Sequence, residues 1–463
     1  MNESKRLIKN TGIIAVGNLG TKLISFFLLP LYTAILTTSQ YGTVDYVISI
    51  ATFCTPFVTM LMDEAIFRFL IDCKDKAGQK KVITTSLFIV FAGMIIFTAV
   101  AIPVMNLLGY DYTYFAVTYV VLSSFCGMLS ALLRGIGRTD LYALFNFLQG
   151  ALQVILNVFF IAVFRWGVEG MLLASILSFS CVSILFSIMI RLWKYIRFDY
   201  YDKLLAKEMV IYSLPLIPNK ISWTIINLSD RIILMNVIGS SATGLYAVSY
   251  KFPNLMDTVY GFFYQSWKES SARALNADDH DSFYNNVYGY LKNFMYAIVL
   301  GMSAFMPLVF KIMINNNYYE AVYYVPILLL ATYFSNISGF YGGIFTAYKD
   351  TKIMGTTTVV AAIVNVIVNL AMIFKFGIYA AAISTLVANF VVYVYRKLKV
   401  KKYIELVENF KSSLLSIAVT AIVFILFYMQ NIWSISVSCV IVVVYAVATN
   451  WKLLAYVKKQ LKR

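Results

Sequence analysis

The chain has 463 residues, of which 60% are hydrophobic and only 13% are charged, and its formal net charge is +16. A soluble domain of this size could not bury so much apolar surface, so these values exclude a soluble enzyme or binding module. The positive charge does not indicate nucleic-acid binding, because most Lys and Arg residues lie in short connections between apolar stretches.

About fourteen apolar stretches are each long enough to cross a bilayer as a helix. We expect spans at 11–36, 42–66, 82–105, 112–133, 141–164, 168–190, 209–237, 243–266, 287–310, 322–347, 353–374, 377–395, 411–429 and 432–451. The predicted fold class is therefore an all-α polytopic membrane protein.

Lys and Arg gather before the first predicted span, in every second connection and after the last span. The alternate connections hold only Arg165, Lys311 and Lys375. Because cations are retained on the cytoplasmic side, this asymmetry predicts that both termini are cytoplasmic. We see no cleaved signal peptide in this pattern, so the first span is expected to remain as an anchor.

The two halves of the chain resemble each other weakly. Three polar residues recur at constant spacing, with Thr139, Gln153 and Asn157 matching Thr351, Asn365 and Asn369. We therefore predict two pseudo-symmetric six-helix lobes around a central cavity, an N-lobe at 1–200 and a C-lobe at 201–404, followed by helices 13 and 14 at 405–463.

Charged and polar residues inside the predicted spans are expected to line this cavity, because a charge facing lipid at mid-bilayer costs about 2.5–3.5 kcal/mol. Four cations suit a substrate with a phosphate centre: Lys22, Lys220, Arg231 and Lys251. Amide and phenol side chains suit attached sugars or cavity lining: Asn18, Asn227, Tyr246, Tyr250 and Tyr260.

Three carboxylates are candidates for coupling transport to a proton or a sodium ion: Asp63, Asp230 and Asp257. A helix-packing ion pair of Asp230 with Arg231 is an equally weighted alternative. We predict no metal or cofactor, since His280 has no second histidine or cysteine ligand nearby. Because no nucleophile–base set or nucleotide loop is present, we do not expect an enzyme.

Several short motifs carry a family resemblance. They are Pro215-Leu216-Ile217-Pro218-Asn219, Asn227-Leu228-Ser229-Asp230-Arg231, the run from Gly244 to Pro253, and Arg134-Gly135 followed by Gly137-Arg138-Thr139. With these motifs the chain resembles the polysaccharide transporters of the MOP superfamily, specifically the Wzx-type flippases.

The resemblance implies a multi-pass protein of the bacterial plasma membrane. Such a protein moves undecaprenyl-pyrophosphate-linked oligosaccharide units of an O-antigen or capsule from the inner to the outer leaflet by alternating access. It implies membrane lipids, a polysaccharide polymerase and a chain-length regulator as partners, and no nucleic acid. In the second span the chain departs from the related lipid II flippases, because its one cation, Arg68, lies at the cytoplasmic end; Lys220 is expected to substitute.

Two alternatives remain open from the sequence. One is a cation-coupled multidrug exporter on the same scaffold, and the other is a membrane-embedded glycan polymerase, for which Arg165 and Glu169 would be the pair to test. Helices 13 and 14, with Phe424, Phe427 and Tyr428, are expected either to hold the polyprenyl tail in a groove or to be ordinary lipid-facing surface.

Overall fold

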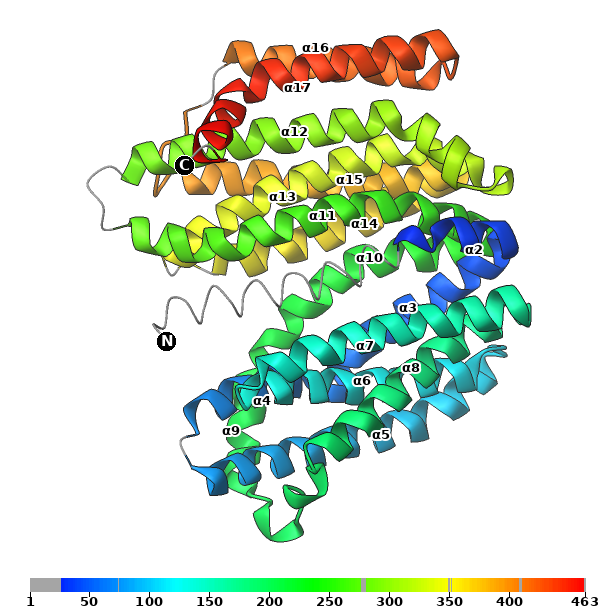
Figure 1. Ribbon diagram of the computed structural model, residues 1–463, viewed down its shortest axis with the longest axis vertical. Coiled ribbons are helices and arrows are strands. Elements are labelled where there is room, and N and C mark those ends of the chain that lie inside the picture. Colours follow the sequence, from blue (N-terminus) through cyan, green and yellow to red (C-terminus); the bar gives the residue numbers. More distant parts are fainter. Residues whose placement is uncertain are drawn as a thin grey trace. The chain divides into compact units, whose positions relative to one another are not determined.

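The computed structural model describes residues 26–73, 75–275, 280–348, 350, 352–407 and 410–461, and every regular element in this part of the chain is helical (Figure 1). The helices form two units, Met1–Met235 and Asn236–Arg463. The predicted lobe boundary at residue 200 is therefore not where contacts divide the chain. The reason is that α9 packs against α4 and α5, and Arg231 of α10 (Ile217–Val237) pairs with Asp45 of α3 (Thr38–Thr59), so these helices stay with the first unit.

The first unit contains the helices up to α10. Their bounds are α2 Leu29–Ile35, α3 Thr38–Thr59, α4 Met62–Asp72, α5 Lys76–Leu107, α6 Thr113–Gly135, α7 Thr139–Asn157, a π-helical extension of α7 at Val158–Val163, α8 Gly167–Met189, α9 Lys203–Ser213 and α10 Ile217–Val237. Between α8 and α9 lie short 3-10 turns at Leu192–Lys194 and Phe198–Tyr200, and a third turn at Leu214–Leu216 joins α9 to α10.

The second unit contains the remaining helices. Their bounds are α11 Ser240–Ala274, α12 His280–Met313, a 3-10 segment η5 at Asn316–Tyr324, α13 Val325–Ala347, α14 Lys352–Phe376, α15 Ile378–Val400, α16 Phe410–Tyr428 and α17 Ile432–Leu461. α16 and α17 pack against each other and against α12. The two helices that follow the predicted C-lobe therefore belong to the second unit.

Each unit repeats one order of helix packing. In the first unit α8 packs on both α6 and α7, while α6 also packs on α3 and α5. In the second unit α15 packs on both α13 and α14, while α13 also packs on α11 and α12. Helices at equivalent places in the chain therefore meet in both units, which supports the internal repeat predicted from polar residues.

Matching polar residues make matching contacts. Gln153 on α7 donates a hydrogen bond to Ser175 Oγ on α8 at 2.8 Å. Asn365 on α14 donates to Thr385 Oγ1 on α15 at 3.3 Å. Gln153 and Asn365 are partners in the repeat, so this amide-to-hydroxyl bond joins the same pair of helices in each unit. These rows stabilise helix packing, as amide side chains commonly do inside membranes.

Nine helices of the described residues are long and apolar enough to cross a membrane, or ten if the bent pair α3 and α4 counts as one span. The first predicted span, 11–36, lies mostly outside the described residues. α10 and α11 carry Lys220, Arg231 and Lys251, which lower their apolar character, and α16 is short. The first span, α10, α11 and α16 account for the difference between the ten spans found and the fourteen predicted. The predicted all-helical membrane fold is confirmed.

Candidate functional site

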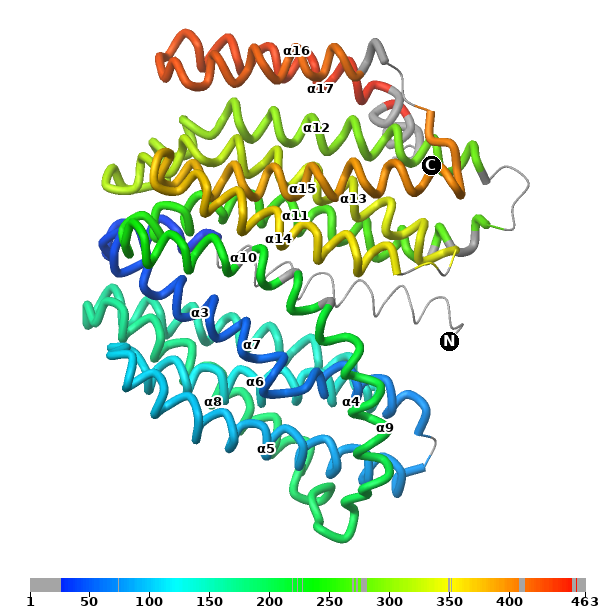
Figure 2. Tube along the Cα trace, turned by 180° about the vertical axis from the view of Figure 1, so that it is seen from behind, coloured from blue at the N-terminus to red at the C-terminus, as the bar shows by residue number. Residues whose placement is uncertain are grey.

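The chain breaks between α3 and α4, inside the span predicted at 42–66 (Figure 2). Met60 and Leu61 have φ angles of 49° and 52°, and the two helices differ in direction by 47°. L-residues adopt this left-handed conformation at a steric cost, so the surrounding packing must hold it. The span predicted at 42–66 is therefore a bent pair of helices; no glycine marks the turn, and Pro56 lies one helical turn before it.

A polar pocket of about 250 Å³ lies at this break, within the first unit. Asp63 of α4 and Lys220 of α10 both line it. Hydroxyl side chains of α3 and α6 complete the polar part of the wall: Thr52, Thr55, Thr59, Tyr119, Ser123 and Ser124. The predicted phosphate ligand Lys220 and the predicted coupling residue Asp63 thus share one cavity.

Two polar atoms of this wall are buried and lack a hydrogen-bond partner among the described residues. They are Oδ1 of Asp63 and Oγ of Ser124. A buried polar atom without a partner is destabilising, and a carboxylate inside a membrane span is especially so. The pocket is therefore suited to a group that satisfies the Asp63 oxygen, either a proton or a hard cation held by carboxylate and hydroxyl oxygens.

A second, smaller pocket of about 140 Å³ shares Asp63 and Gly127 with the first. Arg134 lines its other part, and the guanidinium carbon of Arg134 lies 4.1 Å from the centre of the Phe67 ring. Arg134 received no role from the sequence. The signal was present, since Ser123, Gly127, Ser130 and Arg134 follow at helical spacing on α6.

The predicted phosphate ligand Arg231 is held by a carboxylate. Its Nε donates to Oδ2 of Asp45 on α3 at 2.5 Å, and the two side chains are only 10% and 19% exposed. This ion pair joins α10 to α3 and neutralises much of the charge that Arg231 would offer a substrate. The sequence suggested Asp230 as the partner of Arg231; Asp230 is buried in the same unit.

The predicted tyrosines of α11 face the interior of the second unit. Tyr246 is fully buried, and its ring centre lies 5.6 Å from that of Tyr250. Tyr260 is also buried, and its hydroxyl has no hydrogen-bond partner among the described residues. Lys251 is half-buried and Asp257 is exposed on the same helix. The tyrosines of α11 therefore pack within the second unit, whereas Asp257 lies on the surface of that unit.

Arg396 is a buried cation that the sequence reasoning missed. It lies on α15, is 2% exposed, and donates to Thr357 Oγ1 and to the Ser338 carbonyl oxygen at 3.0 Å each. No carboxylate of the described residues forms an ion pair with it. Because Arg396 follows the span predicted at 377–395 and precedes several lysines, the sequence predicts it in a cytoplasmic connection. In the structure it joins α13, α14 and α15.

Three predicted site residues have no description here. Lys22 and Asn18 lie outside the described residues, and so does the side chain of Asn227. The predicted tail groove on the last two helices stays a prediction. Phe427 is buried, and the Tyr428 hydroxyl donates to the Tyr323 carbonyl oxygen at 2.8 Å, so these side chains pack α16 against its own unit.

The family model described as "Polysaccharide biosynthesis protein" matches residues 7–267, more than half of the chain. No curated protein matches the chain.

Solved structures share the fold at low sequence identity. The lipid II flippase MurJ in an inward closed conformation is 15% identical, with a TM-score of 0.72, and the match covers 95% of this chain and 99% of that one. An inward-facing multidrug resistance MATE family transporter of the MOP superfamily is 14% identical, with a TM-score of 0.67 and coverage of 84% and 98%. A MOP superfamily transporter from Pyrococcus furiosus is 14% identical, with a TM-score of 0.58 and coverage of 85% and 95%.

Proposed function

Because this chain belongs to the polysaccharide biosynthesis protein family and has the fold of MOP-superfamily transporters, we propose that it is a flippase for lipid-linked oligosaccharides. Its cargo is an undecaprenyl-pyrophosphate-linked repeat unit of an O-antigen or capsule, and it moves that unit from the inner to the outer leaflet of the bacterial plasma membrane. Both termini lie in the cytoplasm. It acts in transport and catalyses no bond-breaking step.

The observation that carries the proposal is the polar pocket at the break between α3 and α4. Lys220 supplies a compact cation for phosphate, and the pocket's hydroxyl groups can hydrogen-bond phosphate or sugar. Lys22 and Lys251 are the further cations that we assign to the pyrophosphate. Arg231 makes a smaller contribution, since Asp45 already neutralises it.

The proposed coupling to an ion is supported by Asp63 and Lys220 lining the same pocket. While Asp63 is charged, it offsets the positive charge of Lys220 and weakens phosphate binding. When a proton or sodium ion occupies Asp63, Lys220 is left to attract the phosphate. Ion exchange at Asp63 would thus alternate the pocket between holding and releasing the head group, while the two lobes rock to change access. Asp230 and Asp257 are the other carboxylates that could couple.

The test is the leaflet distribution of lipid-linked repeat units in cells depleted of the protein. The cells are complemented at matched membrane levels with wild type, Lys220→Ala, Lys251→Ala or the control Lys375→Ala. We expect wild type and the control to restore export, whereas Lys220→Ala and Lys251→Ala leave single repeat units on the cytoplasmic leaflet.

Two outcomes would replace this function by another. Units that reach the outer leaflet but stay unpolymerised would indicate the glycan polymerase. Normal polymer together with increased drug sensitivity would indicate a cation-coupled multidrug exporter, which the MATE-like fold also accommodates. Under the proposed function, a polysaccharide polymerase and a chain-length regulator act on the exported units.

A further inference from the structure

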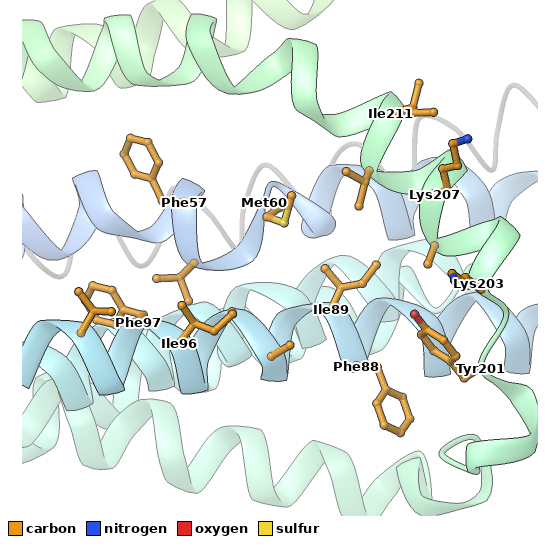
Figure 3. Close-up of a pocket in the computed structure, with 16 residues that line it drawn as sticks. Phe57, Met60, Phe88, Ile89, Ile96, Phe97, Tyr201, Lys203, Lys207 and Ile211 are labelled. Carbon is orange, nitrogen blue, oxygen red and sulfur yellow. The ribbon is translucent and has the colours of Figure 1, made fainter.

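An open groove of about 860 Å³ runs along the first unit between α3, α5 and α9 (Figure 3). Val58 of α3 and Gly93 of α5 both line it, and the two helices are close together there. A Cβ atom at Gly93 would lie 2.1 Å from the Val58 carbonyl oxygen, so glycine is needed for this approach. The groove lies apart from the polar pocket and shares no lining residue with it.

Most of the groove is apolar and has a defined length. The α5 residues that line it extend from Phe88 to Val100, which at 1.5 Å per residue is about 18 Å. The hydrocarbon core of a bilayer is roughly 30 Å thick, so the groove is about as long as one leaflet is deep. An acyl chain of a single leaflet matches this length.

One end of the groove is cationic. Lys203 and Lys207 lie one helical turn apart on α9, with Tyr201 beside them, while Ile96 and Phe97 lie toward the other end (Figure 3). Both lysines are exposed, and neither forms an ion pair with a carboxylate of the described residues. They lie in the connection at 191–208 that the charge pattern assigns to the cytoplasm.

The carboxylate directly before Lys203 is already occupied. Asp202 accepts hydrogen bonds from the backbone N–H groups of Leu204 and Leu205 at the start of α9, and it lies 3.5 Å from Lys81 Nζ. These contacts, led by the Leu205 N–H, lower the pKa of Asp202 and keep it charged and engaged. Tyr201 is fixed separately, since its ring packs 5.6 Å from that of Phe88. The two lysines, which line this end of the groove, are therefore not engaged by Asp202.

We propose that this groove binds an anionic phospholipid of the cytoplasmic leaflet. One acyl chain lies along α5, and the phosphate meets Lys203 and Lys207 at the level of the head groups. The apolar wall alone would accept any lipid, but two adjacent cations at one end select a negative head group. The one-leaflet length favours a phospholipid over the longer polyprenyl chain of the cargo. This site is independent of the flippase assignment.

Native mass spectrometry of the full-length protein with added phosphatidylglycerol or phosphatidylcholine tests the proposal. We expect wild type to retain phosphatidylglycerol about tenfold more strongly than phosphatidylcholine. The double variant Lys203→Gln/Lys207→Gln should lose that preference. The matched double variant Lys76→Gln/Lys194→Gln, which removes two exposed lysines outside the groove, should keep it.

A second pair of variants tests the apolar part. Ala92→Trp fills the groove and should reduce retention of both lipids, whereas Ile95→Trp, at an exposed position of α5 outside the lining, should not. Equal retention of the two lipids by wild type, or an unchanged preference in Lys203→Gln/Lys207→Gln, would overturn the proposal. Displacement of bound phosphatidylglycerol by polyprenyl phosphate would also overturn it and assign the groove to the cargo's tail.

Discussion

The ion pair between Arg231 and Asp45 shows how one contact can join helices distant in sequence. Both side chains are mostly buried, so neither charge is well solvated when its partner is removed. The main effect of this ion pair is therefore to stabilise the first unit. Its effect on the charge available to a substrate is secondary.

Arg231→Ala should lower the free energy of unfolding by on the order of 2 kcal/mol, between the values typical of surface and buried pairs. The reason is that Asp45 would remain charged and unpaired. Thermal unfolding of the purified protein in detergent measures this loss. The double variant Asp45→Ala/Arg231→Ala should be more stable than Arg231→Ala. If the loss of stability in the double variant equals the sum of the losses in Asp45→Ala and Arg231→Ala, the two side chains do not interact.

Asp63 and Lys220 line the same polar pocket, and one oxygen of Asp63 has no hydrogen-bond partner among the described residues. Asp63→Asn should make transport insensitive to an imposed proton or sodium gradient, since the amide can neither exchange a proton nor neutralise a cation. Cargo movement in proteoliposomes with and without each gradient measures this. The control Asp72→Asn removes an exposed carboxylate of the same helix, which pairs with Arg68, and should leave the response intact. A gradient response that survives in Asp63→Asn would assign coupling to Asp230 or Asp257.

At the scale of elements, the break between α3 and α4 separates two environments. Phe57, Val58 and Met60 line the apolar groove, while Thr59 and Leu61 line the polar pocket. Neighbouring residues of one short segment thus form part of each wall, although no residue lines both. In the second unit the corresponding helix, α11, runs unbroken from Ser240 to Ala274, so the break distinguishes the two copies of the repeat.

The close approach of α3 to α5 depends on Gly93. Gly93→Ala should lower the free energy of unfolding by about 1–3 kcal/mol, because the new methyl group collides with the Val58 carbonyl and the helices must separate. Gly127→Ala is the control, since no atom beyond its own helix lies within 4 Å of the added Cβ. Thermal unfolding of both variants in detergent makes the comparison. Equal stability of the two would show that α3 and α5 are not tightly packed at this point.

At the scale of the whole molecule, the alternation of cations sets an expected orientation. Arg165 lies in a connection assigned to the outside, whereas Arg138 lies in one assigned to the cytoplasm. In a chain whose five native cysteines have been replaced, Arg165→Cys should react with a membrane-impermeant thiol reagent in intact cells. Arg138→Cys should react only after permeabilisation. The reverse pattern would invert the topology and the direction of transport.

The sequence by itself determined the fold class, because twenty-residue apolar stretches have one stable solution in lipid, the hydrogen-bonded helix. It also indicated the repeat, since Gln153 and Asn365 keep their chemistry at matching places and make matching contacts. The family could be predicted from short motifs for a similar reason: each is a local run of residues, which can be read without knowing its neighbours in space.

Only the tertiary structure decided which side chains meet. Asp63, Ser124 and Lys220 come from three helices, and Arg231 pairs with Asp45, which lies 186 residues earlier in the chain. Helical periodicity gives the face on which a residue lies, but not the helix that this face will contact. The turn at Met60 and Leu61 was equally hidden, because non-glycine residues become left-handed only when packing around them compensates for the steric strain.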